Sequence, residues 1–186
     1  MLNIKDFIFE VTIKSLQFYE SFFGVKFPFS KYDSLFVPEF NFGAMENPGC
    51  VTFNDSYIFR EKKVASSYTS LANTISHEMS HMWFGNYVTM KWWNDLWLNE
   101  SYADFISHFC LQHLDIKSIP LTDIGVMFNR GKGWGYRDDQ MITTHPIAGD
   151  VPNTETAETI FDGITYSKGA SVMKQLLCIM GMLFVS

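Results

Sequence analysis

Two histidines four residues apart flank a glutamate in the pentad His77-Glu78-Met79-Ser80-His81, and Glu100 follows nineteen residues after the second histidine. On a helix, residues at this spacing lie about 40° apart in projection and about 6 Å apart along the axis. Both imidazoles can therefore reach one metal ion, with Glu78 beside a water molecule on that ion. A second helix would supply Glu100. Two histidines, one carboxylate and an open fourth position are typical of a catalytic zinc site, because structural zinc sites close all four positions.

The alternative is an amphipathic helix with two surface histidines. The residues that follow the pentad, Met82-Trp83-Phe84, are large and apolar, which favours histidines that are buried or at the floor of a cleft. A buried pair of histidines without partners would be costly. The surroundings therefore favour the metal site.

The pattern of apolar residues and turn residues predicts the elements that would position these groups. An α+β fold is expected, dominated by helices, with a short mixed sheet near the N-terminus. We expect, in chain order, a helix over 11–23 ending at Gly24, a strand over 31–37, an edge strand or loop over 42–49, a strand or hairpin over 50–53 and 57–59, helices over 66–84, 98–114 and 121–129, a glycine-dense segment at 131–135, an irregular connection over 143–153 and a final helix over 164–180.

Composition excludes several classes of protein. Of the 186 residues, 47% are apolar and 17% aromatic, which predicts a folded domain and not a disordered chain. The net charge of −6 and the absence of a Lys/Arg cluster argue against a nucleic-acid partner. The three cysteines have no Cys-x-x-Cys spacing, so neither a disulfide framework nor a cysteine-based zinc site is expected.

Location and membrane topology can be judged only from short segments. No signal peptide is evident at Met1–Asp6, and with no disulfide pattern the sequence favours a cytoplasmic location. The apolar run Leu176–Val185 is too short to span a bilayer, so no membrane segment is expected in this chain.

Four motifs together resemble the zinc aminopeptidases of the aminopeptidase N type, gluzincins with a thermolysin-like catalytic domain. They share order, spacing and content over about residues 10–181: Gly43-Ala44-Met45-Glu46-Asn47, the pentad, Trp97-Leu98-Asn99-Glu100 and Tyr166-Ser167-Lys168-Gly169. The resemblance implies a metalloprotease that releases the N-terminal residue from peptides with a free N-terminus, using one Zn²⁺ per chain.

The resemblance also implies roles for individual residues. His77, His81 and Glu100 would hold zinc, and Glu78 would act as the general base. Tyr166 matches the family's catalytic tyrosine, which would donate its phenolic hydrogen to the developing oxyanion. From the residues alone, an aromatic side chain in the core at the start of a helix is an equal alternative for Tyr166.

Glu46 would make the enzyme an exopeptidase. A carboxylate near zinc pairs with the free α-ammonium of a substrate, so that only chain ends lie in register with the metal. Gly43 and Ala44 lack bulk, and their backbone could hydrogen-bond a substrate like an added strand; Met45 and Asn47 complete this predicted substrate-binding segment. A Gly-Pro turn with a solvated glutamate is the alternative.

Asp104 lies four residues after Glu100, on the same face of the expected helix. Histidines that bind a metal usually donate their other N–H to a carboxylate or carbonyl. We therefore predict that Asp104 orients His77, with a solvent-facing salt bridge as the alternative.

Family members are longer, with an all-β domain before the catalytic domain and a helical domain after it. We therefore expect residues 1–186 to be a single, incomplete catalytic domain that could associate with the missing domains or with a full-length relative. Two other functions stay open. One is a catalytically silent zinc-binding fragment that acts through interaction, and the other is an endopeptidase of the same fold.

Overall fold

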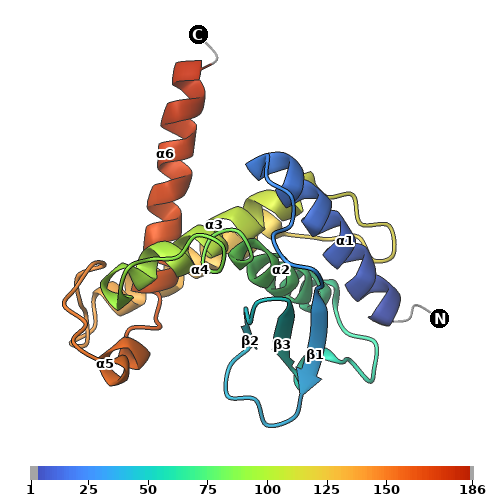
Figure 1. Ribbon diagram of the computed structural model, residues 1–186, viewed down its shortest axis with the longest axis horizontal. Coiled ribbons are helices and arrows are strands. Elements are labelled where there is room, and N and C mark those ends of the chain that lie inside the picture. The colour runs from blue at the N-terminus through green and yellow to red at the C-terminus, as the bar shows by residue number, and fades with distance from the viewer. Residues whose placement is uncertain (1–3, 185–186) are drawn as a thin grey trace. The chain divides into compact units, whose positions relative to one another are not determined.

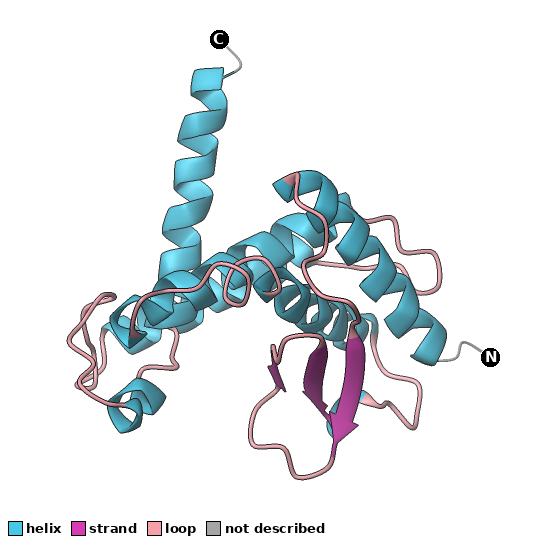
Figure 2. Ribbon diagram, viewed as in Figure 1, coloured by secondary structure: helices cyan, strands magenta, loops and turns pink. Residues whose placement is uncertain are grey.

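The computed structural model describes residues 4–184, so Met1–Asn3 and Val185 of the segments discussed above lie outside the described residues. Helices dominate, with one small sheet (Figures 1 and 2). The elements are α1 (Ile4–Phe23), β1 (Asp33–Val37), β2 (Ala44–Met45), β3 (Cys50–Asn54), α2 (Ala65–His81), α3 (Leu96–His113), α4 (Ile124–Asp139), α5 (Thr154–Thr159) and α6 (Gly169–Phe184). Residues up to 88 and 107–124 form one compact unit, and 89–106 with the residues from 125 onward form a second.

Helix α1 packs against α2 in the first unit (Figure 1). Its buried positions include Phe7, Val11 and Tyr19, spaced so that they share one face. The hydroxyl of Tyr19 donates to the backbone oxygen of Ser76 at 3.0 Å and lies 2.8 Å from its Oγ. Because Ser76 immediately precedes His77, α1 holds the part of α2 that carries the histidines.

The three strands form a mixed sheet in the order β1-β3-β2. β1 runs parallel to β3, and the two-residue β2 pairs antiparallel to β3 at the sheet edge. The predicted fold class and the edge strand at Ala44–Met45 are confirmed. The predicted strand over 57–59 is wrong, because the side chain of Asn54 accepts a hydrogen bond from the Ser56 amide and starts a 3-10 turn over Asp55–Tyr57.

The glycine-dense segment is helical in the second unit. The sequence predicts a helix that ends at 129, but α4 continues to Asp139. A Cβ at Gly135 would lie 3.0 Å from the backbone oxygen of Gly163, and one at Gly163 would lie 2.8 Å from three backbone atoms of Trp134 and Gly135. At Gly135 glycine is required because two backbones meet there, and that contact outweighs its poor helix propensity.

The final helix begins with a π-helical turn over Ile164–Lys168 and continues as α6. The predicted helix over 164–180 is confirmed, apart from this turn and an end at Phe184. A Cβ on Gly169 would lie 2.0 Å from Oγ of Ser101, which donates to the Thr165 oxygen at 2.6 Å. Among the helices of residues 4–184, none combines the length and apolar character needed to cross a membrane.

The contact between α4 and the residues around Gly163 can be tested with alanine. In Gly163→Ala the new methyl group meets backbone atoms that cannot rotate away, and overpacking of this kind destabilises by about 1–3 kcal/mol. Gly133→Ala is the matched control, since nothing lies within 4 Å of its Cβ position. Alanine should stabilise that helical site by about 0.5–1 kcal/mol. Urea unfolding followed by circular dichroism measures both, and equal midpoints would contradict the close contact.

Candidate metal centre and active site

His77 and His81 lie on consecutive turns at the C-terminal end of α2. Their Nε2 atoms are 3.1 Å apart, and the two rings are inclined at 77°. Two ligands of a tetrahedral zinc ion are separated by about 3.3 Å when the Zn–N bonds are about 2.05 Å. The observed separation therefore matches that of two nitrogens on one ion.

The second nitrogen of His81 faces a backbone oxygen. Its Nδ1 lies 3.2 Å from the oxygen of Phe84, and the ring is 1% exposed. A carbonyl oxygen only accepts, so Nδ1 carries the hydrogen and the neutral ring keeps the lone pair of Nε2 for a metal. The turn that returns Phe84 to the ring includes Gly85 at φ 135°, a conformation that favours glycine.

Glu100 lies in the first part of α3 and is 4% exposed. The side chain of Asn99 donates from Nδ2 to Oε1 of Glu100 at 3.4 Å. Glu100 belongs to the second compact unit, whereas His77 and His81 belong to the first. Two imidazole nitrogens and a carboxylate oxygen fit zinc, which accepts both kinds of ligand. Within the first unit, the structure brings together the two predicted histidine ligands.

Glu78 is 6% exposed, as expected for a carboxylate beside a metal and not for a solvated side chain. Burial raises the pKa of the Tyr32 phenol well above its usual range, and the negative charge of Glu78 raises it further. Tyr32 therefore belongs to the surroundings of Glu78. In the sequence it is one residue of the predicted strand over 31–37, with no pattern that links it to the pentad.

The carboxylate of Glu46 lies close to the histidines. Its Oε1 is 3.9 Å from Nδ1 of His81, and the side chain is 15% exposed. Asn86, in the turn after α2, donates its side-chain N–H to the backbone oxygen of Glu46 at 2.7 Å. Its own amide donates to the His81 oxygen at 2.9 Å. Asn86 therefore ties the segment of Glu46 to the histidine helix, a link that the sequence does not reveal.

The rest of the predicted substrate-binding segment forms the sheet edge. The oxygen of Gly43 accepts from the Asn54 amide at 2.8 Å, and β2 follows with Ala44 half-buried and Met45 42% exposed. The side chain of Asn47 donates to Thr52 Oγ1 at 3.2 Å, and its backbone oxygen accepts from the Cys50 amide. In this structure Asn47 holds the turn between β2 and β3.

Tyr166 lies at the centre of the π-helical turn and is half-buried. Its ring stacks on Trp134 of α4, with centroids 5.9 Å apart and an interplanar angle of 29°. The next residue, Ser167, donates from Oγ to Asp104 Oδ2 at 3.4 Å. Asp104 therefore bonds to a neighbour of Tyr166, and its predicted action on His77 stays a prediction.

Comparison with known proteins gives consistent matches. A family model described as the peptidase family M1 domain matches residues 7–183. Aminopeptidase N of Streptomyces lividans is 49% identical over 176 residues, covering 95% of this chain and 20% of that protein. Tricorn protease-interacting factor F2 of Thermoplasma acidophilum is 40% identical over 182 residues, covering 95% and 23%. The chain therefore spans about a fifth of the length of these relatives.

Zinc binding should be measurable as added stability. Zinc at about 100 times its Kd should raise the free energy of unfolding by about 2.7 kcal/mol. His77→Ala and His81→Ala should each remove most of this gain. His113→Ala is the control, since that ring on α3 is exposed and its Nδ1 lies 2.7 Å from the oxygen of Phe109, one turn earlier on the same helix. Unfolding with and without zinc measures the gain, and full stabilisation of the His81→Ala variant would contradict the assignment.

Proposed function

The chain belongs to peptidase family M1, and we propose that it forms catalytic machinery of a zinc aminopeptidase. The predicted resemblance to zinc aminopeptidases of the aminopeptidase N type is thereby confirmed. The observation that carries the proposal is the position of Glu46, 3.9 Å from the ring of His81, whose Nε2 approaches that of His77. An α-ammonium group paired with Glu46 would lie one ring width from the metal ligands, so the first peptide bond of a substrate would lie beside them.

The residues proposed to hold zinc are His77, His81 and Glu100. Zinc in such a site lowers the pKa of bound water toward about 7 and polarises the carbonyl of the substrate. Glu78 takes a proton from the attacking water and passes it to the leaving amine.

Tyr166 is the proposed donor to the oxyanion that forms on the carbonyl. Loss of one such donor typically lowers kcat by about 10²–10³. Support comes from its match to the family motif and from its place in a π-helical turn, a local geometry found frequently at functional sites. We also propose that Asp104 orients His77 by accepting a hydrogen bond from the ring nitrogen that does not bind the metal.

Substrate selection is assigned to the segment from Gly43 to Asn47. β2 is an edge strand, so its outer side offers backbone groups to an extended peptide, which would pair like a further strand. Glu46 then anchors the free amine of that peptide. The proposed substrates are peptides with a free N-terminus. This rests on the chain's own residues and agrees with relatives named aminopeptidases.

Replacing the general base tests the chemistry. Glu78→Gln keeps the shape of the side chain but removes its proton-accepting oxygen, and kcat should fall by about 10²–10⁴. Zinc content should stay at one per chain, and a chelator should abolish activity in the parent chain. Hydrolysis of alanyl and leucyl aryl amides measures the rates. A zinc-loaded chain without turnover would instead support the silent zinc-binding fragment.

Replacing the amine anchor tests the exopeptidase assignment. Glu46→Gln removes a charge-assisted hydrogen bond worth about 1.5–3 kcal/mol, so kcat/KM for free-amine substrates should fall by about 10–150-fold. Glu61→Gln, an exposed glutamate in the loop before α2, is the matched control. N-acetylated peptides should resist the parent chain. Their cleavage at the rate of free peptides would identify an endopeptidase.

A further inference from the structure

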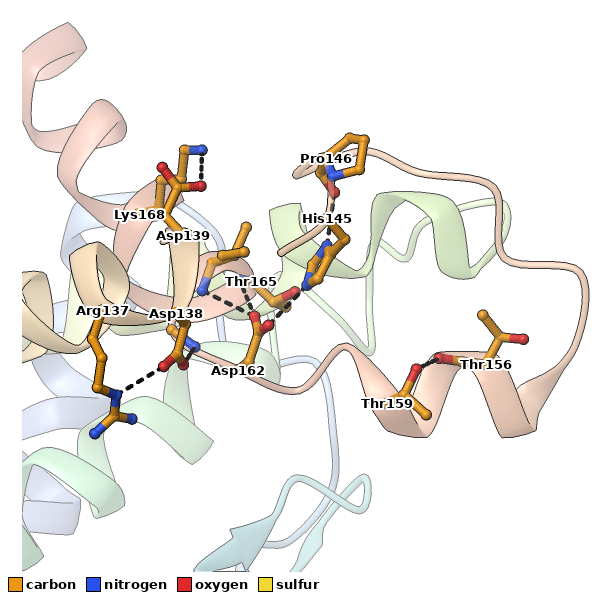
Figure 3. Close-up of polar contacts among 12 residues, drawn as sticks. Arg137, Asp138, Asp139, His145, Pro146, Thr156, Thr159, Asp162, Thr165 and Lys168 are labelled. Atoms are coloured by element: carbon orange, nitrogen blue, oxygen red, sulfur yellow. Dashed lines mark hydrogen bonds and ion pairs between the residues drawn. The ribbon is translucent and has the colours of Figure 1, made fainter. Parts of the chain in front are cut away.

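The side chain of Asp162 accepts hydrogen bonds from the first backbone amides of the turn that carries Tyr166 (Figure 3). Asp162 Oδ1 accepts from the amides of Ile164 at 2.9 Å and Thr165 at 3.1 Å. The backbone oxygen of Asp162 accepts from the amide of Tyr166 at 3.0 Å. The first amides of a helix have no partner within it, so these bonds define where the turn begins.

The second carboxylate oxygen of Asp162, Oδ2, is contacted by His145 of the irregular connection over 143–153. His145 Nε2 lies 2.8 Å from Asp162 Oδ2, and His145 Nδ1 lies 2.8 Å from the oxygen of Pro146 (Figure 3). Both ring nitrogens therefore face oxygens, so the ring lies between the Asp162 carboxylate and the Pro146 carbonyl. His145 thereby fixes the carboxylate plane of Asp162.

A second carboxylate holds the residue between them. Asp138 Oδ2 accepts from the amide of Gly163 at 2.9 Å. Burial alone would raise the pKa of Asp138, but hydrogen bonds from the Gly163 amide and from Arg137 outweigh it and hold the pKa below its usual range. Gly163 also lies close to the backbone of α4. The backbone amides of residues 163–166 therefore all donate to oxygens of two aspartates, Asp138 and Asp162.

We propose that Asp162, oriented by His145, is a positioning residue for Tyr166. The inference rests on the proposed oxyanion role of that tyrosine. A displacement of about 1 Å can lower a rate by about 10²-fold, so the amides that fix the turn also fix the phenolic oxygen. Because a developing oxyanion exists only in the transition state, loss of this positioning lowers kcat and leaves KM nearly unchanged.

Substitutions at Asp162 form a graded series. Asp162→Asn keeps one oxygen for the two amides, and kcat should fall by about 10-fold, whereas Asp162→Ala should lower it by about 10². KM and zinc content should stay within about twofold of the parent. Asp150→Asn, an exposed aspartate of the same connection, is the matched control and should leave kcat unchanged. A larger change in KM than in kcat would overturn the proposal.

A double-mutant cycle separates positioning from general support of the fold. If Asp162 acts through Tyr166, Asp162→Asn should have almost no further effect on the residual kcat of Tyr166→Phe. The same factor in both backgrounds would overturn the proposal and leave the role of Tyr166 intact. An unchanged kcat in Tyr166→Phe alone would instead refute the oxyanion role, and the positioning role with it.

Hydrogen exchange tests the structural step without any need for turnover. In Asp162→Ala the amides of residues 164–166 should lose protection, whereas those in the middle of α4 should keep it. Asp162→Asn should lie between Asp162→Ala and the parent chain. Unchanged protection of residues 164–166 in Asp162→Ala would overturn the proposal even if kcat fell.

Discussion

Two imidazole nitrogens that approach to 3.1 Å must share either a proton or a cation between their lone pairs. This demand, imposed by two histidines on consecutive turns of α2, sets the requirements for the first unit. The helix must not shift, and the bond from Tyr19 to Ser76 secures it one residue before His77. The ring of His81 must not rotate, and the Phe84 oxygen secures that. Asn86 then fixes Glu46 to the same frame.

The second unit solves a different problem, which is to hold a turn with non-standard hydrogen bonding. The amide of Lys168 reaches the oxygen of Gly163, five residues back, at 3.0 Å. Isolated π-helical turns are rare, so the surroundings must determine this one. Asp138 and Asp162 hold the turn by accepting hydrogen bonds from its backbone amides. Gly135 and Gly163 hold it by allowing the backbone of α4 to approach closely. The hydrogen bonds and the close packing therefore stabilise the same backbone conformation of the π-helical turn.

Features with a local sequence signal could be predicted. The four-residue spacing of His77 and His81 shows one helical face, and Ala44 beside glycine and proline punctuation marks an edge. The helical state of the glycine-dense segment could not be predicted, because Gly135, which would weaken an isolated helix, is required here by a partner about 30 residues away. The roles of Asn86 and Asp162 could not be predicted for a related reason. Each bonds to backbone atoms, which all residues share, so no pairing pattern appears in the sequence.

At Gly135 and Gly163, α4 and the start of the π-helical turn approach each other through main-chain atoms, because neither residue has a Cβ. Side chains hop between rotamers as temperature rises, and contacts made by them loosen accordingly. Backbone atoms in van der Waals contact have no such freedom, short of unwinding a helix. The spacing between α4 and the tyrosine turn should therefore be the least temperature-sensitive dimension of the second unit. Thermal softening would begin instead in the exposed connection between α4 and α5.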